Sequence, residues 1–121
     1  KNWSMSKTKK RQIVDYLNDI LESISDIREF IGEMTQEDFV NDKKTINAVI
    51  RSLEVIGEAA RNIPDTLTVC YPDIAWREII SIRNKLSHEY FGIDLDIVWQ
   101  STQEDLQPLE VAIRHMLSSI Q

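Results

Sequence analysis

The sequence has few of the residues that break helices or cross-link chains. Its 121 residues include three glycines, three prolines and one cysteine, Cys70. A lone cysteine excludes an internal disulfide, and the scarcity of glycine and proline disfavours a fold built from many tight turns. No apolar run approaches the roughly 20 residues that a membrane-spanning helix needs. We therefore expect a cytoplasmic protein that makes no contact with a membrane.

The chain also has fewer basic than acidic residues. Twenty acidic residues against 14 basic ones give a formal net charge of -6. This balance excludes a protein that coats nucleic acid through bulk positive charge. A nucleic-acid site on this chain must be local, with positive potential concentrated around Arg83 and Lys85 and helped by Arg51, Arg77 and the basic run at residues 7–11.

Apolar residues recur at helical spacing in the first half of the chain. The first series runs from Ile13 to Ile31 in steps of four and three residues, which predicts one buried helix face. Gly32 ends this series, and Thr35 with Asp38 forms a capping pair that starts the next helix. A second series covers residues 46–63 and stops before a proline at position 64.

The second half of the chain predicts two further helices. One starts near Pro72 or Asp73 and stops at Gly92, and the other is capped by Asp94 and kinked or restarted at Pro108. Helices joined by short connections predict an all-α, antiparallel bundle of four, or up to five, helices. We expect residues 1–121 to form one domain, with residues 1–8 disordered or contributed by an expression vector.

The densest chemistry lies in residues 83–94, which read RNKLSHEYFGID. The planar guanidinium of Arg83 is suited to holding phosphate oxygens, and His88 is the side chain whose ordinary pKa best suits proton transfer near neutral pH. Asn84 and Ser87 place an amide and a hydroxyl between them. This combination suggests chemistry on a phosphodiester, whereas the plain structural alternative is a surface pair of Arg83 and Glu89 with a half-buried histidine.

The spacing within this motif leaves two arrangements open. Residues five apart on a helix are turned about 140° from one another, so Arg83 and His88 do not stack directly. The helix either unwinds toward Gly92 so that His88 turns in, or Arg83 meets His88 at a seam with a second copy. A two-fold dimer would bring both copies of the pair into one cleft.

The motif and its surroundings resemble a known family. The Arg-x4-His-x-Tyr spacing in RNKLSHEYFGID, the upstream RSLEVIGEAA and the helical pattern are similar to HepT-type toxins of the HEPN superfamily, over nearly the whole chain. The resemblance implies a HEPN bundle, usually dimeric, that acts as a metal-independent endoribonuclease toxin in a toxin-antitoxin system. It also implies that Arg83 and His88 are the catalytic pair, that Asn84 assists them, and that no cofactor is needed. The implied partner, besides RNA, is an antitoxin of the minimal nucleotidyltransferase (MNT) type, which can transfer AMP to Tyr90.

A second segment, Gly57-Glu58-Ala59-Ala60, has a simpler explanation. Small residues within an apolar helix allow another helix to approach closely, and we expect that role here. Glu58 is also a candidate to orient Arg83 or Arg51 in the cleft. We expect no metal site, because neither histidine has a partner at ligand spacing and the chain has no cysteine pair.

Two functions therefore compete on the sequence alone. The first is an RNA-cleaving toxin that a partner silences. The second is a non-catalytic HEPN adaptor whose motif binds nucleotide or anchors a partner, because a fold by itself does not determine activity. The intact pair of Arg83 and His88 favours the enzyme.

Overall fold

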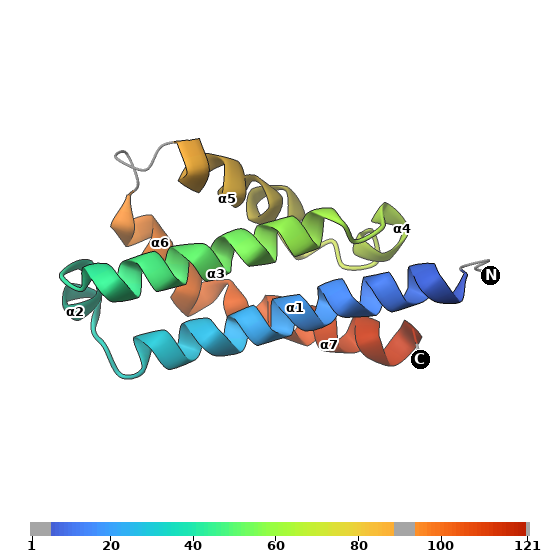
Figure 1. The fold of residues 1–121 in the computed structure, drawn as a ribbon, viewed down its shortest axis with the longest axis horizontal. Coiled ribbons are helices and arrows are strands. Elements are labelled where there is room, and N and C mark those ends of the chain that lie inside the picture. Colours follow the sequence, from blue (N-terminus) through green and yellow to red (C-terminus); the bar gives the residue numbers. More distant parts are fainter. Residues whose placement is uncertain (1–5, 89–93, 121) are drawn as a thin grey trace.

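The computed structural model describes residues 6–88 and 94–120, with the side chains of residues 83–88 left out (Figure 1). Every regular element in these ranges is a helix, which confirms the all-α prediction. The helices are α1 (Lys7–Ile31), α2 (Gln36–Val40), α3 (Lys43–Arg61), α4 (Asp65–Thr68), α5 (Trp76–His88), α6 (Leu95–Glu104) and α7 (Leu106–Ile120). No helix in the described ranges is long and apolar enough to cross a bilayer.

Local signals in the sequence set most of the helix ends. The Ser6 hydroxyl accepts a hydrogen bond from the Lys9 backbone N–H and caps α1, so residues 7 and 8, expected to be disordered, are helical. The chain leaves α1 at Gly32, whose φ of 53° lies where side chains are disfavoured. Thr35 and Asp38 form the expected reciprocal capping box, but they start the short α2. Asp42 caps the long α3 separately.

The start of α5 differs from the prediction. The helix was expected near Pro72 or Asp73, whereas it begins at Trp76. Residues 71–75 form turns because the indole Nε1 of Trp76 donates to the Tyr71 carbonyl oxygen at 3.1 Å, and Ile74 donates through its backbone to the same oxygen at 3.2 Å. A tertiary contact therefore delays the helix beyond the residues that locally favour its start.

The last predicted helix is divided into two. Asp94 caps α6 as expected, and the chain breaks at Asp105 before α7 begins at Leu106. Pro108 lies in the first turn of α7, where its missing N–H removes no helical hydrogen bond, so the predicted restart is confirmed. The buried face of α6 carries Val98, whereas the neighbouring Ile97 is 62% exposed.

The core lies between α1, α3 and α7, as the packing of these elements in Figure 1 shows. The predicted apolar stripe of α1 is buried along its whole length. The buried apolar side chains of these three helices are Ile13, Leu17, Ile20, Ile24, Ile27 and Ile31 on α1, Val49, Ile50, Leu53, Ile56, Ala59 and Ala60 on α3, and Leu106, Leu109, Ala112, Ile113 and Met116 on α7. At roughly 25 cal/mol per Å² of apolar surface removed from water, this burial is the main favourable term in folding.

Two peripheral contacts fix the ends of the bundle. The Tyr71 hydroxyl lies 2.5 Å from His115 Nδ1, which ties the turn before α5 to α7. His115 is therefore an exposed histidine with a structural partner. At the other end, the ring of Phe39 on α2 packs 5.4 Å from that of Trp99 on α6.

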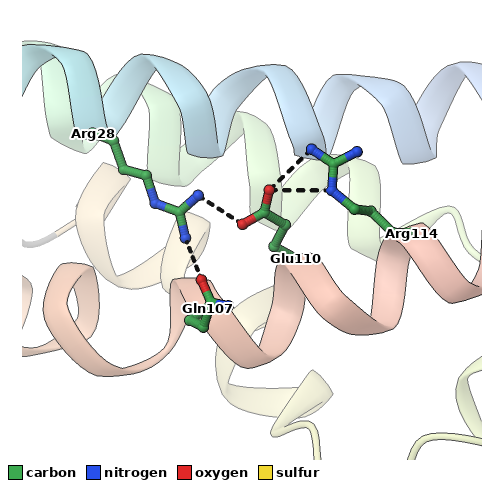
Figure 2. Close-up of polar contacts among 4 residues, drawn as sticks. All are labelled: Arg28, Gln107, Glu110 and Arg114. Carbon is green, nitrogen blue, oxygen red and sulfur yellow. Dashed lines mark hydrogen bonds and ion pairs between the residues drawn. The ribbon is translucent and has the colours of Figure 1, made fainter.

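A polar cluster joins α1 to α7 across the surface of the core (Figure 2). Arg28 Nη1 donates to Glu110 Oε1 at 2.7 Å, and its Nη2 donates to Gln107 Oε1 at 3.0 Å. Arg114 donates to Glu110 Oε2 through Nε at 3.2 Å and Nη2 at 3.0 Å. The hydrogen bond from Arg28, followed by that from Arg114, lowers the pKa of the Glu110 carboxyl below its ordinary value, although burial opposes the shift.

This cluster makes stability depend on pH. Because the pKa of Glu110 is lower in the folded state, its contribution is present above the ordinary value of 4.5 and is lost as pH falls through the folded pKa. We expect Glu110→Gln to lower the free energy of unfolding by about 1 kcal/mol at pH 7, given that both arginines are largely exposed, and by much less near pH 3. Urea unfolding at several pH values measures this difference. Glu22→Gln, an exposed change on α1, serves as the control, and an equal loss in both variants would contradict the assignment.

Candidate functional site

The motif residues lie at the end of α5. Arg83, Asn84, Ser87 and His88 occupy its last two turns. The helix continues through His88, so positions 83 and 88 stay about 140° apart around the axis, and unwinding ahead of His88 is not found. The pairing of Arg83 with His88 across two copies remains a prediction, and Tyr90 lies outside the described residues.

Gly57 explains how closely α5 approaches α3. A Cβ atom at this position would lie 2.9 Å from the carbonyl oxygen of Ile79 and 3.4 Å from Cγ2 of Ile82. Only hydrogen fits there, so the two helices meet through their backbones. The packing role predicted for the small residues of this segment is confirmed. Because Ile82 directly precedes Arg83, this contact fixes where the motif begins relative to α3.

Beside this contact, α3 carries a row of polar residues, which we call the α3 stripe. Its members are Asn47, Arg51, Glu54 and Glu58, spaced by four, three and four residues. Such spacing places them on one face of the helix. Glu58 is turned about 100° from Gly57 around the axis, so the stripe borders the face that packs on α5. In Figure 1, α3 runs between α5 on one side and α1 on the other.

The α3 stripe continues into a hollow between α3 and α1, which we call the α1–α3 hollow. It has a volume of about 370 Å³, and its lining residues are Tyr16, Asp19, Arg51, Glu54, Val55, Glu58 and Ala59. The floor therefore belongs to α3 and one wall to α1. The hollow and the motif helix flank the same stretch of α3.

Glu58 is held firmly at this hollow. Its Oε2 accepts a hydrogen bond from Arg61 Nη2 at 3.2 Å and from Asn62 Nδ2 at 3.4 Å, while Oε1 is buried. Arg51 lines the same hollow, with a side chain that is 78% exposed and an Nη1 atom 3.9 Å from Glu54 Oε1. The structure thus brings Glu58 and Arg51 together. Orientation of Arg83 by Glu58 remains a prediction.

The α1 side of the hollow was missed by reasoning from the sequence. Tyr16 and Asp19 lie within a long helix whose only clear signal is its buried apolar face. No local motif distinguishes them from the other polar residues of α1. Their relevance comes from the antiparallel packing of α1 on α3, which sequence spacing does not specify.

A second concavity, which we call the α5–α7 groove, has a different chemistry. It has a volume of about 170 Å³ and an apolar floor that includes Leu53, Ile79 and Leu109. Its rim carries three carboxylates, those of Asp73, Glu78 and Asp105. These carboxylates would repel an anion, whereas the α3 stripe carries a cation, Arg51, beside its two carboxylates.

Comparison with known proteins gives one family and several relatives. Residues 20–116 match the family model described as ribonuclease HepT-like. The protein named "Probable ribonuclease HepT" from Thermococcus cleftensis is 50% identical over 101 residues, covering 84% of this chain and 92% of that protein. "Putative RNase MJ0127" from Methanocaldococcus jannaschii is 42% identical over 109 residues, covering 87% and 90%. "Putative RNase TTE0752" from Caldanaerobacter subterraneus is 36% identical over 102 residues, covering 84% and 91%. No solved structure matches the chain significantly.

The contact at Gly57 predicts that replacing this glycine by alanine lowers stability, which is the opposite of the usual effect in a helix. Replacing glycine by alanine in a helix interior normally stabilises it by up to about 1 kcal/mol. We expect Gly57→Ala to destabilise the protein instead, by about 1–3 kcal/mol, because the new methyl group forces α5 away from α3. Urea unfolding followed by circular dichroism measures the change, and Asn18→Ala, at an exposed site on α1, is the control for helix propensity. A stabilised Gly57→Ala variant would show that α5 does not pack this closely.

Proposed function

We propose that this chain, which belongs to the ribonuclease HepT-like family of the HEPN superfamily, is a metal-independent endoribonuclease that cuts RNA with Arg83 and His88. The observation that carries the proposal is the position of both residues in the last two turns of one helix, inside the matched range. The names of the relatives, which describe them as ribonucleases, support the same activity.

The proposed reaction uses the ribose 2′-hydroxyl of the substrate as the nucleophile. His88 accepts the hydroxyl proton, and the oxygen attacks the neighbouring phosphorus. The bond between phosphorus and the 5′-oxygen breaks, and the departing oxygen takes a proton from an acid in the cleft. The products are a 2′,3′-cyclic phosphate and a free 5′-hydroxyl. Arg83 stabilises the negative charge that develops on the phosphate oxygens.

Three further side chains support this pair in the proposal. Asn84 and Ser87 are within one turn of Arg83 and His88 and would donate hydrogen bonds to the substrate phosphate or ribose. Glu58 is a positioning residue on the opposing helix, and its fixed carboxylate would orient an arginine of the cleft.

A homodimer would supply the acid and the base together. Each chain has one motif histidine, and positions 83 and 88 of a continuous helix are about 140° apart around its axis. An isologous interface would place two copies of the motif in one cleft, so that one histidine accepts a proton while the other donates one.

We further propose that the protein is the toxin of a toxin-antitoxin pair. Tyr90 follows His88 by two residues in the sequence, and its phenol is the proposed acceptor. An MNT-type nucleotidyltransferase antitoxin would transfer AMP to that phenol. The added nucleotide would fill the cleft and repel the phosphates of RNA.

The ribonuclease proposal predicts a specific product. Purified protein in the presence of a metal chelator should cut a mixed RNA pool, and mass spectrometry should find 2′,3′-cyclic phosphate ends. His88→Ala should lower the rate by about 100-fold or more, because it removes the general base. Unchanged cutting by His88→Ala would contradict the proposed role of this residue. If neither protein cuts RNA, the non-catalytic adaptor is the better description.

The silencing mechanism has a separate test. Protein produced together with an MNT-type nucleotidyltransferase should gain the mass of one or more AMP groups and lose its ribonuclease activity. The Tyr90→Phe variant lacks the acceptor hydroxyl and should stay active and unmodified. Modification of Tyr90→Phe to the same extent would place the acceptor elsewhere.

A further inference from the structure

We propose that the α1–α3 hollow is a subsite for one base of the RNA strand and that it selects guanine, with Asp19 recognising the base and Arg51 holding an adjoining phosphate. This inference rests on the proposed ribonuclease function and adds a base preference to it.

The location of the hollow supports this role. The α3 stripe lies between α1 and α5, and the backbone contact at Gly57 holds the motif helix directly against α3. Glu58 belongs both to the stripe and to the lining of the hollow. Axes of packed helices are about 8–10 Å apart, so a strand cut beside α5 has its neighbouring nucleotides within reach of the hollow.

The size and lining of the hollow suit a single flipped-out base. Its volume of about 370 Å³ falls in the range of small-ligand sites, roughly 300–1,000 Å³. Tyr16 is half-buried and packs against the core, so its ring is a fixed surface at the edge of the hollow. Sequence-specific RNA recognition commonly stacks an unpaired base on such a ring and reads its Watson–Crick edge by hydrogen bonds.

The polar groups of the hollow favour guanine among the four bases. An ionised carboxylate only accepts hydrogen bonds. Guanine presents two adjacent donors, N1–H and the N2 amino group, which match the two oxygens of one carboxylate. Adenine and cytosine place an acceptor nitrogen beside their amino donor, and uracil places its single N–H donor between two carbonyl oxygens. These acceptors would face the carboxylate and be repelled.

Asp19 is the carboxylate best placed to make these bonds. Glu58 already accepts hydrogen bonds from Arg61 and Asn62. The Asp19 side chain is exposed, and it makes no hydrogen bond or ion pair with the residues that the structure describes. Its oxygens are therefore open to an incoming base.

Arg51 offsets the negative charge of this region. Three carboxylates line the hollow, on a chain whose formal net charge is -6, and alone they would repel RNA. The Arg51 side chain pairs with Glu54 at 3.9 Å but is 78% exposed, so its remaining guanidinium donors can reach a phosphate. In this proposal the phosphate contact by Arg51 supplies affinity, and the base contact by Asp19 supplies specificity.

The test measures binding without cleavage. The His88→Ala protein is mixed with fluorescein-labelled nonamers of uridine that carry one central guanosine, inosine, adenosine or cytidine, and fluorescence anisotropy gives each Kd. Inosine lacks only the N2 amino group. We expect the guanosine oligomer to bind on the order of tenfold more tightly than the inosine one, and adenosine and cytidine to bind more weakly still.

Variants then assign this preference to residues. Adding Asp19→Asn should abolish the difference between guanosine and inosine, whereas Asp15→Asn, the same loss of charge one turn away on α1, should preserve it. Arg51→Ala should weaken all four oligomers by a similar factor without changing their order, as expected of a phosphate contact. Equal Kd values for guanosine and inosine, or a preference that survives Asp19→Asn, would overturn the subsite.

The outcomes also separate this proposal from the ribonuclease activity. The same oligomers are incubated with the protein carrying His88. Cleavage with no base preference in binding would support the ribonuclease and overturn the guanine subsite. A guanine preference that depends on Asp19, without any cleavage, would support the subsite and overturn the ribonuclease.

Discussion

The position of the motif helix depends on the contact between the backbones of α3 and α5 at Gly57. With only a hydrogen atom at this position, α5 lies directly on α3, and the motif that follows Ile82 has a fixed relation to the polar residues of α3. The other long helices have their own reasons to pack, because α1 buries its apolar face against α3 and α7, and α7 packs on α1 and α6. For α5 the closeness of approach rests on one missing side chain, and so does the geometry of the proposed cleft.

The distribution of charge follows from the same architecture. Acidic residues outnumber basic ones, yet arginines are placed where they neutralise particular carboxylates, as Arg28 does with Glu110. The α3 stripe combines both signs within a few residues, whereas the rim of the α5–α7 groove is acidic only. The two concavities therefore differ in charge although the chain as a whole is acidic, and the acidic groove is the less favourable one for an anion.

Some features of the fold depend on neighbouring residues in the sequence, and others depend on tertiary contacts. The buried face of α1, the exit at Gly32 and the caps at Thr35 and Asp94 were predictable because each depends on neighbours within one or two turns. The delayed start of α5 was not, because it depends on where the Trp76 side chain finds an acceptor. The residue types of the motif identified it as a candidate site, and Glu58 was identified because it lies among small residues on an apolar helix. Tyr16 and Asp19 could not, because only the packing of α1 on α3 brings them to the hollow.

The attachment of α5 has a consequence for how the protein loses activity. Its main packing partner is α3, whereas α1 and α7 pack on each other as well as on the rest of the core. An element held chiefly by one neighbour loses most of its tertiary packing when that single interface opens, and such local opening requires less free energy than global unfolding. We therefore expect the helix that carries Arg83 and His88 to open before the rest of the fold. Mild heat or denaturant would disable the motif while the three-helix core persists, and a ligand that bridges α5 to the bundle would delay that loss.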